Sequence, residues 1–80
     1  MKIIDIRSRS DYLLGHIDGA ICIPYYDLLF DPSRYLKKEE IYHIYCKSGI
    51  TSKRVVSILN DMGYNTVNID GGYNKLSSSS

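Results

Sequence analysis

The sequence predicts an α/β fold in which a small parallel sheet of about four strands is flanked by helices on both faces. Four short apolar runs alternate with segments that suit helices, and two of these runs are apolar at nearly every position. One intervening segment also carries a clear helical period. With 80 residues the chain can hold one domain, which we expect at residues 1–76, followed by a disordered Ser-rich tail at 77–80.

The four apolar runs have the length and composition of β-strands, because each holds four or five residues and most are rich in Ile, Val or Tyr. They lie at residues 2–6, 20–23, 41–45 and 66–69. The runs at 20–23 and 41–45 lack the alternation of a half-exposed strand, so we expect both of their faces to be covered.

The clearest helical segment is 51–62. Its apolar residues recur at helical spacing on one face, namely Val55, Ile58, Leu59 and Met62. Thr51 or Ser52 can cap the first turn, and Gly63 occupies the position at which a left-handed residue would end the helix. We therefore expect this helix to pack one face on the sheet.

Two weaker helical signals precede that helix. Residues 10–14 suit a single turn with Ser10 as its cap, and residues 25–30 follow Pro24, which favours a helix start. The segment 31–40 combines a proline with a run of charged residues, so we expect it to be a surface loop.

Composition excludes several classes of protein. Ten Lys and Arg residues against nine Asp and Glu give a formal net charge of +1, which argues against nucleic-acid or anionic-membrane partners. No apolar run approaches the roughly 18 residues of a membrane span, and Asp5 and Arg7 interrupt the short apolar start, so we expect no signal peptide and a cytoplasmic protein. Cys22 and Cys46 are too few for a disulfide framework and lack metal-ligand spacing, so we expect neither a disulfide nor a zinc site to stabilise the fold.

Cys46 is the strongest candidate for chemistry, because it ends an apolar strand and is followed by a Gly-containing loop that leads into a helix. In open α/β sheets, ligands bind outside the carboxyl ends of the strands. Amide N–H groups of the loop and the helix N-terminus would point at the sulfur, and Lys47, Lys53 and Arg54 add positive charge. We therefore predict a thiol pKa below the ordinary value of about 8.5.

The other candidates carry weaker signals. Cys22 lies in the middle of a predicted strand, which favours a core role, with a resolving partner for Cys46 as the alternative. Gly49 suits a positive φ that lets amides converge on an anion, although an ordinary turn glycine would look the same. His16 could act as an acid or base, but its place between two glycines is more typical of a histidine that holds a turn. Asp5 and Arg7 lie at the end of the first strand and suit a polar pair that supports loops at the same edge of the sheet.

The chain resembles the rhodanese-like domain family at four ordered landmarks. Residues 4–7 are similar to the family's D-x-R strand. Residues 12–24, reading Y-L-L-G-H-I-D-G-A-I-C-I-P, resemble its E-Y-x-x-G-H-I-x-G-A-x-x-I-P stretch. Residues 45–49 are similar to the family's Y-C-x-S-G active-site loop, and Gly63-Tyr64 with Gly71-Gly72 match the later landmarks.

This resemblance implies a sulfurtransferase in which Cys46 takes a sulfane sulfur from thiosulfate, polysulfide or a protein persulfide and holds it as a persulfide. A thiol or cyanide would then accept the sulfur. The residues implied in binding the sulfur anion are Lys47, Ser48, Gly49, Ile50, Thr51 and Ser52. Asp5, Arg7 and His16 would support the site, and no metal or organic cofactor is implied.

Three departures from the family pattern have consequences. Thr51 stands where the family loop usually has Arg, so we expect weak activity with thiosulfate, because Lys47 supplies charge without bidentate geometry. Leu76 stands where a Trp often follows the double glycine, which removes packing more than chemistry. The strand and helix that usually precede the D-x-R strand are absent from the sequence, and an uncovered sheet edge would favour a homodimer or pairing with another chain.

Two other readings of the same residues stay open. A non-catalytic binding or regulatory module could keep the fold and Cys46 after losing the loop arginine. A cysteine phosphatase or arsenate reductase would need C-x₅-R, but Ser52 occupies that arginine position and Arg54 comes two residues late.

Overall fold

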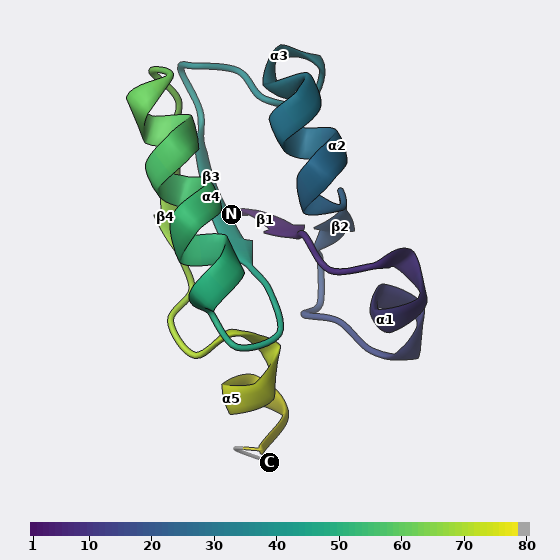
Figure 1. The fold of residues 1–80 in the computed structure, drawn as a ribbon. Helices are drawn as coiled ribbons and strands as arrows, with labels where there is room; N and C mark the ends of the chain where they lie inside the picture. The colour runs from purple at the N-terminus through teal and green to yellow at the C-terminus, as the bar shows by residue number, and fades with distance from the viewer. Residues whose placement is uncertain (79–80) are drawn as a thin grey trace.

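Four strands of the chain lie side by side in one parallel sheet, in the order β2-β1-β3-β4 (Figure 1). The structure is a computed structural model that describes residues 1–78. Its elements are β1 (Lys2–Asp5), α1 (Arg9–Leu14), β2 (Ile21–Cys22), α2 (Tyr25–Phe30), α3 (Pro32–Tyr35), β3 (Ile41–Tyr45), α4 (Ile50–Asp61), β4 (Asn65–Asn68) and α5 (Gly72–Ser78). The predicted α/β class is confirmed.

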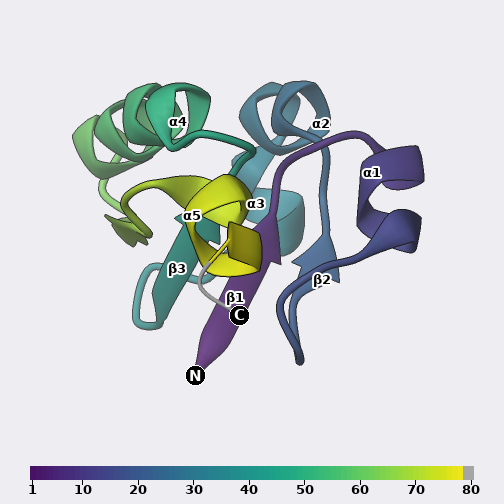
Figure 2. The same ribbon diagram turned by 90° about the horizontal axis from the view of Figure 1, so that it is seen from below.

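One face of the sheet carries the hydrophobic core. Ile4 and Ile44 are register partners on β1 and β3, and both are fully buried. They belong to one cluster with Leu28 of α2 and Leu59 of α4. Figure 2 shows α2 and α4 side by side over this face. The apolar period predicted for α4 therefore faces the sheet, as expected.

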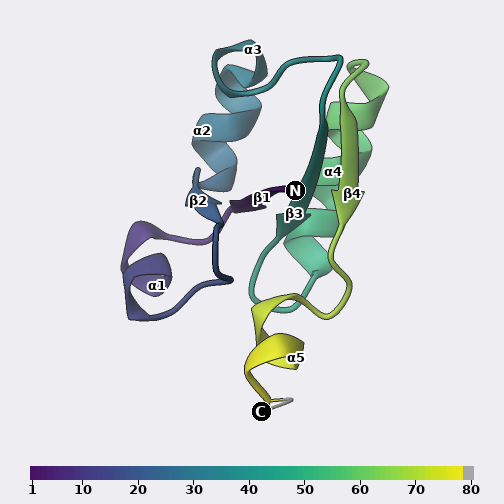
Figure 3. The ribbon, with the colours of Figure 1, turned by 180° about the vertical axis from the view of Figure 1, so that it is seen from behind.

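The opposite face is covered only near the carboxyl ends of the strands, within the described part of the chain. There Tyr73 of α5 stacks on Tyr45, with ring centroids 6.3 Å apart. Figure 3 shows no helix in front of β3 and β4 on this side. The expectation of full coverage holds for the carboxyl half of β3, where Ile44 and Tyr45 face opposite sides of the sheet and are both fully buried. It is wrong for Ile41 at the start of β3, which is 59% exposed, and for Ile21 on the short edge strand, which is 55% exposed.

Helix α1 begins earlier than its sequence pattern suggested. Ser8, not Ser10, is the N-cap, since its Oγ accepts a hydrogen bond of 3.3 Å from the amide of Asp11. A capping side chain accepts from an amide two or three residues further along, and Asp11 stands three residues after Ser8, whereas Ser10 lies within the helix.

Helix α4 begins one residue before the predicted start, and neither Thr51 nor Ser52 caps it. Gly49 is the N-cap, with φ of 93° and no side-chain hydrogen bond to the helix. The amides of its first turn are directed toward Cys46 instead. At the other end Gly63 has φ of 95° immediately after Met62, which confirms its predicted role in ending the helix.

The segment 31–40 is not entirely a loop, because Pro32–Tyr35 forms α3. Pro32 opens this helix and is buried, and Leu36 just after it belongs to the core cluster. The helix therefore depends on tertiary burial more than on a local signal. At the chain end, α5 extends to Ser78 and so includes half of the expected tail, while residues 79–80 lie outside the described residues. None of the helices in residues 1–78 is long and apolar enough to cross a membrane.

Candidate active site

Cys46 lies at the carboxyl end of β3, where the chain turns into α4. Its side chain is nearly buried, and its Sγ accepts hydrogen bonds from two backbone amides, at 3.1 Å from Gly49 N and 3.3 Å from Ser52 N. The hydroxyl of Ser52 lies 3.3 Å from the same sulfur. The positive φ of Gly49 turns its own amide back toward the sulfur, so the loop and the first turn of α4 form an anion-binding cradle around Sγ.

The cradle lowers the pKa of the Cys46 thiol. Burial raises this pKa, but hydrogen bonds from the Ser52 hydroxyl and from the amides of Ser52, Gly49 and Ser48 outweigh it. The direction agrees with the prediction from sequence. The cause differs in part, because the charges of Lys47, Lys53 and Arg54 are not among the largest contributions.

Alkylation of Cys46 is expected to reach half its maximal rate at a pH below that of an ordinary thiol, because the thiolate is the reacting species. The Cys46 pKa is lower in the folded state than in the unfolded state, so ionisation of Cys46 stabilises the fold. This stabilisation is fully present above the pKa of the unfolded state and is lost as the pH falls through the pKa of the folded state. A pH–rate profile with iodoacetamide, taken on Cys22→Ser so that one thiol reacts, measures this midpoint. A midpoint equal to that of the urea-unfolded protein would contradict the cradle.

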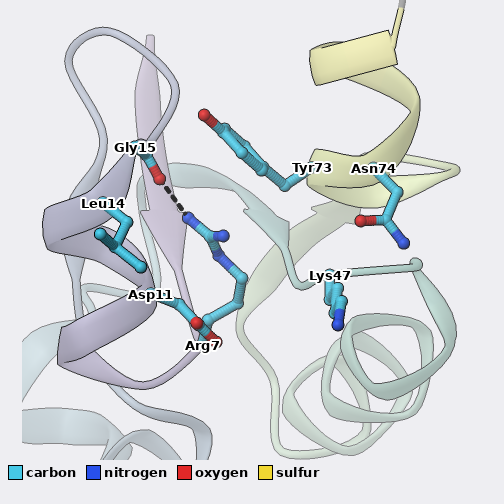
Figure 4. Close-up of a pocket in the computed structure, with 7 residues that line it drawn as sticks. All are labelled: Arg7, Asp11, Leu14, Gly15, Lys47, Tyr73 and Asn74. Carbon is cyan, nitrogen blue, oxygen red and sulfur yellow. Dashed lines mark hydrogen bonds between the residues drawn. The ribbon is translucent and has the colours of Figure 1, made fainter.

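A cavity of about 260 Å³ opens beside Cys46. Its lining residues are Ile6, Arg7, Ser8, Asp11, Tyr25, Tyr26, Cys46, Lys47, Ser48 and Thr51. A second cavity of about 250 Å³ shares Arg7, Asp11 and Lys47 with it. Figure 4 shows how Arg7 and Gly15 on one side of the second cavity face Tyr73 on the other. The sulfur is therefore reached through a small opening with both acidic and basic side chains at its rim.

Asp5 and Arg7 form the polar pair that the sequence predicted. Asp5 is fully buried, and its carboxylate accepts two close hydrogen bonds from the Arg7 side chain, at 2.7 Å from Nη2 and 3.0 Å from Nε. The phenol of Tyr45 donates to the same carboxylate at 2.7 Å. Hydrogen bonding to Asp5 raises the pKa of Arg7, and burial together with the Asp5 hydrogen bond raises that of Tyr45.

Arg7 also joins segments that are far apart in sequence. Its Nη2 donates to the carbonyl of Gly15 at 2.6 Å, after α1 (Figure 4). Its guanidinium lies 4.2 Å from the ring centroid of Tyr73 on α5. Arg7 therefore holds the rim of the site in place, and much of its hydrogen-bonding capacity is used by protein groups.

The double glycine that follows β4 packs directly behind the Cys46 loop. Gly72 has φ of 60°, and a Cβ there would overlap the carbonyl oxygen of Cys46 and lie 2.8 Å from the amide nitrogen of Gly49. The backbone also makes hydrogen bonds across this contact, from Tyr73 N to the Cys46 carbonyl at 2.9 Å. Only a residue without a side chain allows this close approach.

The remaining predicted residues lie at different distances from the sulfur. Thr51 lines the cavity, whereas Ile50 is exposed and does not. His16 is also outside both cavities, with its Nδ1 2.8 Å from the Tyr12 carbonyl and its ring stacked on Tyr12 at 3.8 Å. Cys22 is half-buried, and burial raises the pKa of its thiol.

Cys22 is also badly placed to resolve a disulfide with Cys46. It pairs with Asp5 on the far side of β1, and Asp5 in turn pairs with Tyr45 of β3. Two strand spacings of about 4.8 Å therefore separate β2 from β3, which exceeds the reach of a disulfide. Cys22 is half-buried and is not among the residues of the core cluster, so the predicted core role does not hold either.

Sequence reasoning did not single out Asn68, Asp70 or Tyr73. Asn68 ends β4, the neighbour of β3, and its Oδ1 accepts from the Ser52 hydroxyl at 2.5 Å. A polar residue at the end of the adjacent parallel strand was the available signal, because such ends meet at one edge. For Tyr73 the sequence offers no comparable signal. Among residues 1–78, no three His, Cys, Asp or Glu side chains are grouped so that they could hold a metal ion.

Fold and site together define an α/β domain with a buried cysteine in an anion-binding loop that lowers the pKa of its thiol. The sequence matches the rhodanese-like domain family over residues 1–79, so the chain belongs to that family. This confirms the resemblance seen in the sequence motifs.

Individual relatives agree with this assignment. The chain is 33% identical over 72 residues to YtwF of Bacillus subtilis (strain 168), which carries a provisional sulfurtransferase name. The aligned region covers 90% of this chain and 69% of that protein. It is also 33% identical over 70 residues to the thiosulfate sulfurtransferase PspE of Escherichia coli (strain K12), covering 86% and 67%. The crystal structure of SSP1007 from Staphylococcus saprophyticus aligns with a TM-score of 0.87 at 36% identity, over 94% of this chain and 74% of that one.

Proposed function

We propose that this protein is a sulfurtransferase in which Cys46 accepts a sulfane sulfur, holds it as a persulfide and transfers it to a second acceptor. The observation that carries the proposal is the pair of amides, Gly49 N and Ser52 N, that point at Sγ from 3.1 and 3.3 Å. Such a cradle stabilises a sulfur anion, whether it is the thiolate or the outer sulfur of a persulfide. The sulfurtransferase names of two relatives support the same class of reaction.

The transfer proceeds by two displacements. The Cys46 thiolate attacks the outer sulfur of a donor such as thiosulfate, a new S–S bond forms, and the donor's S–S bond breaks with its electron pair leaving on sulfite. The outer sulfur of the persulfide then carries the negative charge. An acceptor thiolate or cyanide attacks that sulfur, and Cys46 leaves as a thiolate, so the enzyme returns to its starting state.

The loop and its neighbours have distinct proposed roles. Residues 47–52 supply the amides and the polar side chains that bind the sulfur anion. Lys47 adds a positive charge at the rim, where it lines both cavities. Asp5 and Arg7 hold the rim together through their ion pair. His16 does not line the cavity and supports the site indirectly, because its hydrogen bond to the Tyr12 carbonyl fixes the turn after α1.

Mass spectrometry of the intact protein tests the proposal. Incubation with thiosulfate or inorganic polysulfide should add one sulfur atom, which cyanide should remove. Cys46→Ser should show no gain, whereas Cys22→Ser, the matched control, should gain and lose the sulfur like the unmodified protein. Absence of a gain with every donor would favour a non-catalytic binding or regulatory module instead.

Two observations bear on the alternatives. The cavity beside Cys46 contains Arg7, but that guanidinium is paired with Asp5. Arg54 lines a neighbouring groove between α2 and α4 and not this cavity. A phosphatase or arsenate reductase would need a guanidinium free to grip the oxyanion, so these observations favour sulfur transfer.

Thr51→Arg is expected to raise thiosulfate turnover by about tenfold or more, because Thr51 is exposed at the cavity rim and a guanidinium there would bind the donor's sulfonate in a bidentate manner. Steady-state assays with thiosulfate and cyanide measure this effect. Thr51→Lys is the matched control, since it adds the charge without the forked geometry and should raise turnover less. Unchanged rates in Thr51→Arg would show that donor binding is not what limits the site.

We infer that the natural donor is a polysulfide or a protein persulfide, with a thiol as acceptor, because among residues 1–78 no free guanidinium is aimed at the sulfur. A cytoplasmic location, the lack of nucleic-acid partners and a homodimer through the sheet edge stay predictions. Sedimentation of the purified protein would check the homodimer.

A further inference from the structure

A chain of hydrogen bonds leads away from the Cys46 sulfur into the end of β4. The thiol lies 3.3 Å from Ser52 Oγ, Ser52 Oγ donates to Asn68 Oδ1 at 2.5 Å, and Asn68 Nδ2 donates to Asp70 Oδ1 at 3.1 Å. Ser52 is fully buried, so its hydroxyl has no access to solvent. The chain connects the first turn of α4 with the residue at which β4 ends.

Asp70 determines which way the Asn68 amide faces. A carboxylate can only accept hydrogen bonds, so the NH₂ group of Asn68 must point at Asp70. The carbonyl oxygen of Asn68 then points at Ser52, and this oxygen can only accept. The single proton of the Ser52 hydroxyl is therefore held by Asn68, and the lone pairs of Oγ face the sulfur.

This arrangement suits the two protonation states of Cys46 unequally. A thiol can donate its proton to the lone pairs of Ser52 Oγ while Ser52 donates to Asn68. A thiolate accepts hydrogen bonds, and the amides of Gly49 and Ser52 already donate two. When the thiol proton leaves to water, the Ser52 hydroxyl can donate a third only by rotating toward the sulfur and releasing Asn68 Oδ1. Asn68 and the Cys46 thiolate thus compete for one proton.

We propose that Asn68 is a positioning residue that holds the Ser52 hydroxyl proton away from Cys46 in the thiol state and yields it to the sulfur when the thiolate forms. The inference rests on the proposed function only in that Cys46 is taken as the nucleophile. Asn68 does not touch the sulfur and acts through Ser52. Its effect on the thiol should therefore vanish when the hydroxyl is absent.

Other charged and titratable groups around the sulfur do not confound this prediction, because they stay the same within each pair of variants. Those that face the cavity from the segment after β1, from α1, from α2 and from the Cys46 loop are Arg7, Asp11, Tyr25, Tyr26 and Lys47. Arg54 of α4 lines the neighbouring groove, and Asp70 lies beyond Asn68.

The test is the Cys46 thiol pKa, measured by pH-dependent alkylation in a Cys22→Ser background. Asn68→Leu fills a similar volume without an acceptor, so it should lower the pKa by about 0.5–1 unit, which is about a threefold to tenfold rise in the thiolate-to-thiol ratio. Ser52→Ala should raise the pKa, because it removes a donor to the thiolate. Adding Asn68→Leu to Ser52→Ala should leave the pKa unchanged.

Two further variants separate positioning from a general structural effect. Asn68→Ala removes the same acceptor with less volume and should shift the pKa in the same direction. Asn60→Ala breaks the hydrogen bonds of 2.8 and 2.9 Å that join α4 to Thr66, so it should lower stability without moving the Cys46 pKa.

The inference is overturned if both Asn68 variants leave the pKa unchanged or raise it, or if Asn68→Leu shifts it equally with and without the Ser52 hydroxyl. Because alkylation requires no sulfur transfer, this outcome is independent of whether the mass-spectrometric test detects a persulfide.

Discussion

Gly72→Ala is expected to lower the free energy of unfolding by about 2–4 kcal/mol and to move the Cys46 pKa toward that of an ordinary thiol. Gly72 has φ of 60°, and an added Cβ would overlap the Cys46 carbonyl oxygen. It would also lie 2.8 Å from backbone atoms of Gly49 and Lys47. Backbone atoms cannot swing aside as a flexible side chain can, so the whole cradle must shift. Denaturant titration and the alkylation profile measure the two effects.

Gly19→Ala is the matched control for Gly72→Ala. Gly19 has a similar φ of 85°, but a Cβ there would meet no atom within 4 Å. This variant should therefore carry only the strain of the left-handed conformation, about 1 kcal/mol, and leave the Cys46 pKa unchanged. Equal losses of stability in the two variants would show that the close contact behind the cradle has little energetic weight.

Asp5→Ala is expected to lower the free energy of unfolding by about 3–5 kcal/mol, because it leaves the Arg7 guanidinium buried without its counter-charge. The Arg7 side chain is 8% exposed, and the Tyr45 phenol would lose its acceptor as well. Since native domains are stable by only about 5–15 kcal/mol, we expect a large fall in the urea midpoint. The same measurement on the unmodified protein provides the reference.

Lys2→Ala provides the comparison for an exposed ion pair. Lys2 lies 3.5 Å from Glu40 in a pair whose side chains are 56% and 35% exposed. Solvent screens such pairs, so this substitution should change stability by less than about 1 kcal/mol. If Asp5→Ala costs no more than Lys2→Ala, the buried pair does not hold the rim of the site as we infer.

Much of the fold could be predicted because its signals are local. The strand runs are rich in β-branched and aromatic residues, and α4 carries a helical period that ends before Gly63. The predictions of secondary structure and burial failed where tertiary packing, and not the local sequence, determines the outcome. Helix α3 has four residues and no strong period, so it forms because Pro32 and Leu36 are buried, and the exposed side chain of Ile21 follows from its place on an edge strand.

For the site, the sequence alone determined the candidate cysteine, the loop that surrounds it and the direction of its pKa shift, since all of these lie within seven consecutive residues. Only the tertiary structure showed which residues from β4 and the segment after it pack against that loop. Asn68 reaches Ser52, and Gly72 reaches Cys46, because β4 pairs with β3 in a particular parallel register. Such contacts depend on which strands become neighbours and how they align, and no local pattern of residues specifies either.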